Sequence, residues 1–131
     1  MKFEGEVVKD GEAEGKALVT DEPISFLGGI DPNSGKIIES DHQIEGKSVK
    51  QKILIFPHGK GSTVGSYVLY QLKSNGKAPA AIINRNAEPI VAVGAIIADI
   101  PMLHKLNRDP IKRIENGEHL KVKGRFLTRQ K

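Results

Sequence analysis

One stretch of fifteen residues decides the fold: Phe56-Pro57-His58-Gly59-Lys60-Gly61-Ser62-Thr63-Val64-Gly65-Ser66-Tyr67-Val68-Leu69-Tyr70. The apolar run at residues 53–56 predicts a buried strand, and Pro57 ends it because proline has no N–H to donate. Apolar residues then recur at 64, 67, 68 and 72, the spacing of one helix face, and the hydroxyl residues directly before this face suit an N-cap. The stretch therefore predicts a strand, a glycine loop and the start of a helix.

This junction is of the kind that collects anions. Gly59 and Gly61 permit backbone angles that other residues avoid, and a helix N-terminus directs free N–H groups and the positive end of its dipole at one point. Two interpretations stay open on the residues alone: an anion or oxyanion bound near Ser62, or a tight turn followed by a capped helix. The Walker pattern is absent because Leu54 occupies its first glycine position, and the dinucleotide fingerprint is absent because Val64 occupies its third.

Apolar runs on both sides of this stretch predict the rest of the architecture. Strands are expected at residues 3–8, 16–20, 47–56, 80–83, 90–97 and 120–124, and the first two are expected to pair antiparallel. Residues 100–106 predict a helical turn. The main helix should end near Gly76, which can adopt a left-handed cap. We therefore expect an α/β fold with mixed β-structure and one main helix after the glycine loop.

A long segment without periodicity precedes the glycine loop. Residues 23–35 contain Gly-Gly, Asp-Pro and Asn-Ser-Gly, all of which favour turns. Long irregular segments are uncommon in a small domain and are often functional. The alternative is an ordinary surface loop that is capped by Asp31.

Length and charge set further limits. A chain of 131 residues should form one domain, residues 1–131. Residues 1–45 hold eleven acids and four lysines, whereas residues 46–131 hold sixteen bases and five acids. The basic part would attract an anionic ligand, or it is simply a solvated surface. Residues 121–131 carry five bases and no acid, and are expected to be a loose or partner-contacting tail.

Composition argues against several classes of function. The chain has no cysteine, so an iron–sulfur cluster would need thiolates from another chain, and the four histidines lack metal-ligand spacing. No window of about eighteen apolar residues predicts a membrane span, and the N-terminus lacks an apolar signal core, so we expect a cytoplasmic protein. The basic tail has one aromatic residue, Phe126, which argues against nucleic acid as a partner. A hydrolase elbow around Ser62 is absent because Lys60 and Val64 occupy its glycine positions.

Three ordered motifs resemble the small subunit of the aconitase X family: Phe26-Leu27-Gly28-Gly29-Ile30-Asp31-Pro32, His58-Gly59-Lys60-Gly61-Ser62 and Lys77-Ala78-Pro79-Ala80. The resemblance covers roughly residues 3–122. It implies a swivelling β/β/α domain and a large partner subunit that holds a [4Fe-4S] cluster and most of the site for a small anionic substrate. This chain itself would bind no cofactor.

The resemblance also implies roles for residues of the glycine loop. Ser62 matches the family's catalytic serine in Gly-Ser-x-x-Gly-Ser, the base that removes the proton α to the substrate carboxylate while the partner's open iron polarises the leaving hydroxyl. Lys60, Gly61 and Thr63 are expected to bind substrate, as is Asp31 unless it caps its own loop. Thr63 stands at the start of the positions where aconitase has Ser, Arg and Glu, so citrate is a poor candidate substrate.

Archaeal members of the family dehydrate (R)-5-phosphomevalonate to trans-anhydromevalonate 5-phosphate in the mevalonate pathway. We expect the same hydro-lyase activity here, in a heterodimer or larger assembly with the large subunit. A lysine-rich, cysteine-free, free-standing chain favours this archaeal route. Two alternatives stay open: dehydration of cis-3-hydroxy-L-proline, the activity of bacterial relatives, and a non-catalytic module in which the glycine loop binds an anion.

Overall fold

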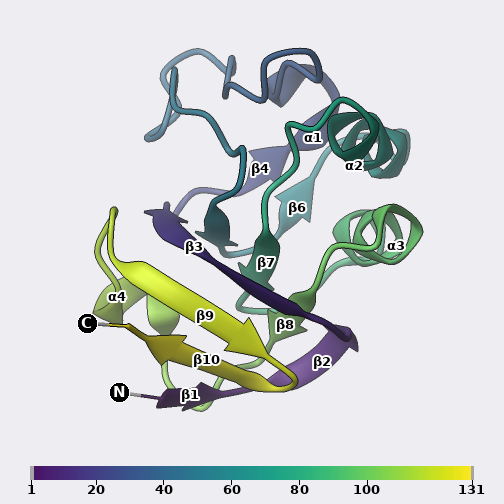
Figure 1. Cartoon of the computed structure of the whole chain (residues 1–131). Coiled ribbons are helices and arrows are strands. Elements are labelled where there is room, and N and C mark those ends of the chain that lie inside the picture. The colour runs from purple at the N-terminus through teal and green to yellow at the C-terminus, as the bar shows by residue number, and fades with distance from the viewer. Residues whose placement is uncertain (1, 131) are drawn as a thin grey trace.

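The glycine loop follows a strand, β5, that lies between two parallel neighbours in the sheet (Figure 1). The computed structural model describes residues 2–130. Within them, α2 connects β5 to β7 and α3 connects β7 to β8, so both helices are crossovers between parallel neighbours. The elements of this group are β3 (Glu12–Val19), β5 (Ile53–Phe56), α2 (Gly65–Ser74), β7 (Ala81–Asn84), α3 (Pro89–Ala98) and β8 (Met102–His104).

Antiparallel strands extend this group on both sides. The sheet has the order β1-β10-β9-β3-β5-β7-β8-β2. Its two outermost strands, β1 and β2, are consecutive in the chain and only Gly5 separates them, so the sheet curls until its edges meet. Asn107 helps to close the seam, since its N–H donates to the Glu4 carbonyl (2.8 Å) and its Oδ1 accepts from the Glu4 N–H (3.0 Å). These strands are β1 (Lys2–Glu4), β2 (Glu6–Lys9), β9 (His119–Lys123) and β10 (Phe126–Arg129).

The two faces of the sheet bury separate apolar cores, which explains the unbroken apolar run of β5. Ile53 and Ile55 belong to the core enclosed by the curled sheet, whereas Leu54 and Phe56 face the core beneath α2 and α3. The enclosed core also contains Phe3, Ala17, Val19, Ala81, Ile83, Leu103, Ile114, Leu120, Val122 and Leu127.

The turn-rich segment between β3 and β5, residues 20–52, which we call the irregular segment, belongs to the helix-side core and is more than a surface loop. It buries Ile24, Phe26, Ile30, Ile37, Ile44 and Val49 in that core. Within it, β4 (Ile24–Ser25) pairs parallel with β6 (Gly59–Lys60), and the single turn α1 (Phe26–Gly29) follows β4. A last short helix, α4 (Pro110–Arg113), lies before β9. The segment is thus held against the glycine loop by strand pairing.

The expected α/β fold with a main helix after the glycine loop is confirmed, but residues 90–97 form helix α3 and not a strand. The Glu88 carboxylate accepts hydrogen bonds from the N–H groups of Ile90 (2.9 Å) and Val91 (2.7 Å), and Pro89 occupies the first helical turn. These two residues are the start signal that the apolar composition obscured.

Three smaller predictions are also wrong. Residues 102–104 form strand β8 instead of a helical turn, because they pair with β7 on one side and β2 on the other. The two opening strands do not pair, since β3 pairs with β9 and β5. The strand before the glycine loop begins at Ile53, because residues 47–52 form only an isolated bridge between Ser48 and Lys36 and a turn at residues 50–51.

The expected loose basic tail is wrong for residues 121–129. Strand β10 pairs with both β9 and β1, and Leu127 is fully buried. Bases of this region pair with acids of the N-terminal strands: Lys121 with Glu12 (3.4 Å) and Arg125 with Glu4 (3.2 Å). The opposite charges of the two ends of the chain therefore serve cross-strand pairing. Residue 131 lies outside the described residues.

No helix within residues 2–130 is long and apolar enough to cross a membrane.

Candidate functional site

The glycine loop is held from below by the strand pair β4–β6. Ile24 and Ser25 lie opposite Gly59 and Lys60 in this pair. Gly61 has φ +91°, and a Cβ at this position would lie 2.7 Å from the Ser25 hydroxyl oxygen, so only glycine fits the turn. The loop therefore leaves the strand pair in a fixed direction.

Ser62 stands at the open end of this loop. Its hydroxyl oxygen accepts a hydrogen bond from the Val64 N–H (3.1 Å), and its carbonyl accepts one from the Gly65 N–H (2.9 Å). Helix α2 begins at Gly65 with Val64 as N-cap, so the expectation that a hydroxyl residue occupies the cap position is wrong. Within the described residues, the N–H groups of Ser62 and Thr63 have no hydrogen-bond partner. Ser62 thus lies among N–H groups that can receive a negative charge.

The loop is an open surface. Residues 60–64 are all exposed. A cavity of about 480 Å³ lies elsewhere, beside Lys73, Gly76 and Asp99, where α2 and α3 end. A ligand on the Ser62 loop would therefore be covered by this chain on one side only.

Lys60 gives the loop a positive charge. Its Nζ lies 3.2 Å from Glu39 Oε2, and both side chains keep substantial exposure. Glu39 comes from the irregular segment and also lies near Gly29, so this segment and the loop meet at the ion pair. An exposed ion pair of this kind is weak, and an anionic ligand can compete for the ammonium group.

Gly59 brings the start of α3 to the site. A Cβ on Gly59 would collide with Val91 Cγ2 and with Glu88 Oε1, the carboxylate that caps α3. The first turns of the two helices also approach each other, because a Cβ on Gly65 would lie 3.2 Å from Ile90 Cγ2. Both helices therefore begin beside the glycine loop.

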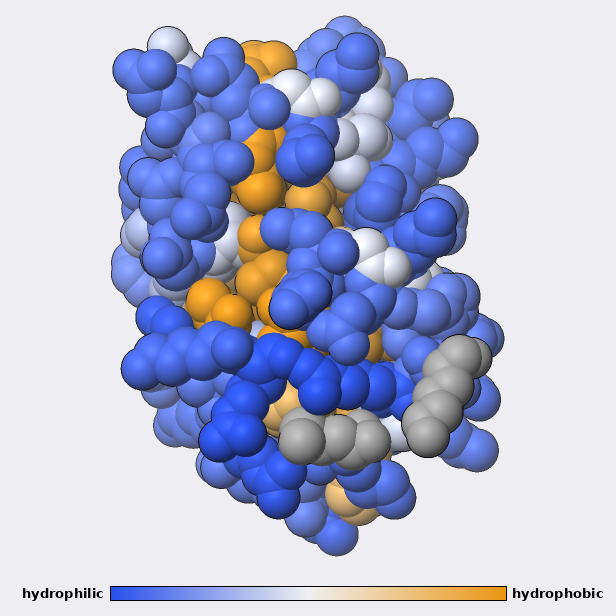
Figure 2. Space-filling model, turned by 90° about the vertical axis from the view of Figure 1, so that its left-hand side faces the viewer, coloured by the Kyte–Doolittle hydropathy of each residue, from blue (hydrophilic) through white to orange (hydrophobic). Residues whose placement is uncertain are grey.

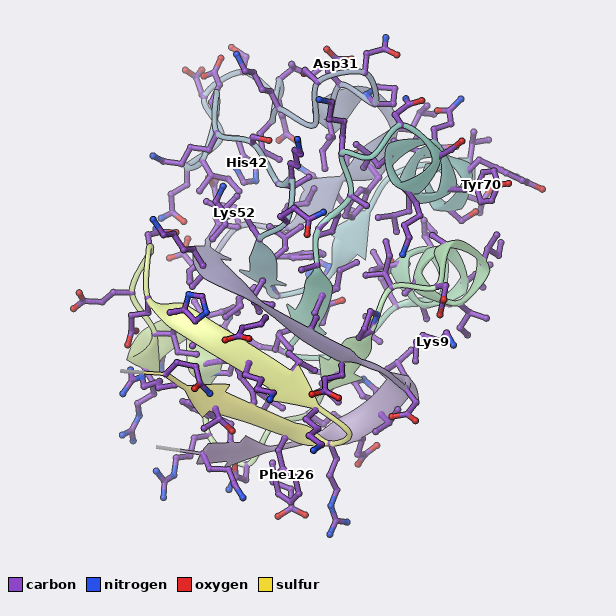
Figure 3. The ribbon with its side chains drawn as sticks, viewed as in Figure 1. Lys9, Asp31, His42, Lys52, Tyr70 and Phe126 are labelled. Atoms are coloured by element: carbon purple, nitrogen blue, oxygen red, sulfur yellow. The ribbon has the colours of Figure 1, made fainter. Side chains whose placement is uncertain are left out.

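Asp31 lies away from this cluster. Its carboxylate accepts hydrogen bonds from the Asn33 N–H (3.0 Å) and the Ser34 hydroxyl (2.9 Å), and these two bonds lower its pKa. The same turn contacts the far end of α2, where Asn75 donates to the Pro32 carbonyl (2.8 Å). Ten helical residues at 1.5 Å each place that end about 15 Å from the start of α2. Figure 3 shows Asp31 at the top edge of the view, on the outer side of the irregular segment.

Three of the four histidines bond to backbone groups. His42 is buried, and its Nε2 lies 3.0 Å from the Pro23 carbonyl, while His58 Nδ1 lies 2.7 Å from the Gly59 carbonyl. His104 Nδ1 accepts from the Ala87 N–H (2.9 Å). Burial, assisted by the neighbouring Lys105 charge, lowers the pKa of this ring. Residues 2–130 contain no group of three or more histidine or acidic side chains that could hold a metal ion.

The structure thus brings together Lys60, Gly61, Ser62 and Thr63, and separates Asp31 from them. Three neighbours were missed from the sequence: Ser25, Glu39 and Glu88. The Glu88-Pro89 pair was a readable helix start, whereas nothing in the sequence marks Glu39 as the partner of Lys60.

Comparison with known proteins places the chain in a family. The family model described as the aconitase X swivel domain matches residues 2–128. This chain belongs to the aconitase X swivel domain family. The resemblance and the swivel-domain fold expected from the sequence are therefore confirmed.

Individual members of the family are similar to this chain in sequence and in structure. The phosphomevalonate dehydratase small subunit of Methanosarcina mazei is 55% identical over 124 residues, which are 95% of this chain and 86% of that protein. The protein of the same name from Methanocella arvoryzae is 56% identical over 124 residues, 95% of this chain and 94% of that protein. In the crystal structure of Thermococcus kodakaraensis aconitase X in its holo form, a chain 44% identical to this one superimposes with a TM-score of 0.94 and covers 100% of this chain and 99% of that one.

Proposed function

We propose that this chain is the small subunit of a phosphomevalonate dehydratase and supplies the catalytic serine, Ser62. One observation carries the proposal: curated proteins of that name are 55–56% identical to this chain over 95% of its length. The reaction is the dehydration of (R)-5-phosphomevalonate to trans-anhydromevalonate 5-phosphate. The proton on the carbon α to the carboxylate and the hydroxyl on the next carbon leave as water, and a double bond forms between the two carbons.

Ser62 would take the proton. A serine hydroxyl is ordinarily too weak an acid to be present as an alkoxide, so the oxygen needs local stabilisation of its negative charge. The Val64 N–H already donates to this oxygen (3.1 Å), and the start of α2 directs its dipole at the same place. Exposure of the loop leaves the hydroxyl accessible to a bound substrate.

Lys60 would hold one of the two anionic groups of the substrate. Lys60 stands two residues before Ser62 in the loop. Its ion pair with Glu39 is exposed and therefore weak, so an anionic group of the substrate can take the place of the Glu39 carboxylate. The unpaired N–H of Thr63 and the left-handed turn at Gly61 would complete the substrate-binding loop. We assign Asp31 to its own turn, since its carboxylate is already occupied at the other end of α2.

The remaining groups of the active site belong to a partner in this proposal. A [4Fe-4S] cluster cannot be held by a chain without cysteine, so the large subunit would bind it and provide the Lewis acid for the departing hydroxyl. The open surface around Ser62 supports a shared site, because a substrate there needs a second wall.

The test is the kinetics of Ser62→Ala, Thr63→Ala and Lys60→Met, each assembled with the large subunit and assayed with (R)-5-phosphomevalonate. Ser62→Ala should lower kcat by about two to four orders of magnitude, the usual contribution of a positioned acid–base group. Lys60→Met should mainly raise KM. Thr63→Ala is the matched control, because it removes the neighbouring hydroxyl and leaves the Thr63 N–H in place.

Two alternatives have distinct outcomes in the same assay. Turnover of cis-3-hydroxy-L-proline in place of the phosphorylated substrate would identify the other dehydratase of the family. A Ser62→Ala enzyme with normal turnover, and only about 1 kcal/mol less stable through the lost Val64 hydrogen bond, would make the loop a non-catalytic anion-binding module.

A further inference from the structure

The outer surfaces of α2 and α3 are apolar and exposed. Six large apolar side chains there, each 46–63% exposed, define what we call the α2–α3 face: Val64, Tyr67, Tyr70, Val93, Ile96 and Ile97. Helix α3 has no polar side chain at all, so it is apolar on its solvent side as well as its core side. A helix with this composition is normally covered on all sides.

The six side chains form one surface because the two helices are in close contact. Gly94 makes this contact possible, since a Cβ there would lie 2.5 Å from Leu69 Cδ1 and 3.2 Å from the Ser66 Cα. At 100° per residue, Tyr70 on α2 and Ile97 on α3 lie at the outer edge of the contact between the two helices, and Tyr67 and Val93 point outward beside them. Figure 3 shows Tyr70 projecting away from the sheet.

Charge is scarce on this surface. The α3 segment has no charged residue, and α2 has only Lys73, whose Nζ donates to the Asp99 carbonyl (2.9 Å). The opposite side of the molecule differs: Figure 2 shows it covered mainly by hydrophilic residues, with hydrophobic ones confined to a central strip. Depletion of charge together with exposed aromatic residues is the composition of the buried centre of a protein interface.

The α2–α3 face is continuous with the Ser62 loop. Val64 belongs to both, and Leu27, 45% exposed, lies on the other side of the loop where its backbone approaches Gly65. A partner that covers a substrate on Ser62 would therefore meet this apolar surface next. A second copy of this chain bound to the α2–α3 face would cover the side from which a substrate reaches Ser62.

We propose that the α2–α3 face is the surface on which the large catalytic subunit docks. The inference rests on the proposed function, because that function requires a partner over the Ser62 loop. It adds the residues of contact: the tyrosines of α2 and the aliphatic residues of α3, which would lie in an uncharged, permanently covered interface of the kind found in obligate complexes.

The experiment measures association of the full chain with the large subunit, by titration calorimetry, for Tyr67→Glu and Ile97→Glu. Each should weaken association at least tenfold, because each places an unpaired carboxylate in an apolar interface. Neither should lower the melting temperature of the isolated chain, since both side chains are exposed. At saturating large subunit, Ile97→Glu should recover wild-type kcat.

Two controls keep this test separate from the test of Ser62. Lys123→Glu reverses a charge on β9, away from both helices, and should bind as the wild type does. Ser62→Ala should also bind normally while it loses turnover, so normal turnover of that variant would refute the proposed function and leave the docking result unaffected. Wild-type association of both Tyr67→Glu and Ile97→Glu would overturn the docking surface. Self-association of the isolated chain that Tyr67→Glu abolishes, with heteromeric association unchanged, would likewise overturn it in favour of a second copy.

Discussion

Gly59 offers a sharp test of how the glycine loop and α3 are joined. The residue lies in a strand and has no left-handed φ angle, so its need for glycine comes from close approach alone. In Gly59→Ala the new methyl group would meet Val91 Cγ2 and Glu88 Oε1. Val91 is fully buried and can shift only at a packing cost, whereas the Glu88 side chain is half-buried, so its carboxylate should be displaced from the start of α3.

The expected cost has two parts. Insertion of a methyl group into a filled contact typically costs about 1–3 kcal/mol. Loss of the Glu88 hydrogen bonds to Ile90 and Val91 removes a helix cap, about 1 kcal/mol. The reduced entropy of the unfolded chain returns about 0.4–1 kcal/mol. The free energy of unfolding should therefore fall by about 2 kcal/mol, which lowers the melting temperature of a chain of this size by about 8 °C.

The assay is urea unfolding followed by circular dichroism, arranged as a double-mutant cycle of Gly59→Ala and Glu88→Ala. Glu88→Ala alone should cost about 1 kcal/mol through the lost cap. When Glu88 is already alanine, the new methyl group of Gly59→Ala meets only Val91, and there is no cap left to lose. The double variant should therefore be about 1 kcal/mol more stable than the sum of the two single changes predicts. Additive costs within about 0.4 kcal/mol, or an unchanged melting temperature of Gly59→Ala, would refute the contact between loop and cap.

Three further changes probe other parts of the structure. Gly94→Val should lower the free energy of unfolding in urea by about 1–3 kcal/mol, because the side chain meets Leu69 between the two helices. For His104, burial lowers the pKa below the unfolded value of about 6.5, so the neutral ring stabilises the fold above that pH. This stabilisation is lost as the pH falls through the folded pKa. His104→Gln should therefore flatten the pH dependence of the melting temperature below about pH 6.5, and an unchanged slope would contradict this. Asp31→Ala should lower the melting temperature through its turn and leave kcat unchanged, and a large loss of kcat at normal stability would return Asp31 to the substrate site.

The local order of strand, glycine loop and helix was predictable because it depends on neighbouring residues. Pro57 cannot donate, Gly61 takes a positive φ angle, and the apolar spacing of α2 is regular. The exact start of α2 was not predictable. The Ser62 hydroxyl accepts its hydrogen bond from the Val64 N–H, two residues further on, and Val64 itself occupies the N-cap position. A one-residue difference in the first turn decides which N–H the hydroxyl meets.

Long-range features were beyond local pattern. Helix α3 was mistaken for a strand because its exposed face is as apolar as its buried face, which removes the period that marks a helix. The tail was mistaken for a loose segment because its partners, β1 and β3, stand more than one hundred residues earlier. Lys60 was found as part of a motif, but Glu39 was not, because an ion pair across a turn-rich segment leaves no spacing in the sequence.

The seam at Gly5 has a consequence for synthesis of the chain. Strands β1 and β2 emerge from the ribosome before the other elements of the sheet, yet β1 pairs with β10 and β2 with β8. The first strands must therefore wait, unpaired, until nearly the whole chain has emerged, and the pairing of β1 is among the longest-range contacts that a chain of 131 residues can make. Such non-local pairing slows folding and leaves strand edges open to other chains in the meantime. In the finished protein the same seam removes those edges: the eight-stranded sheet ends on two strands that are continuous through Gly5, and it offers little edge to which another strand could be added.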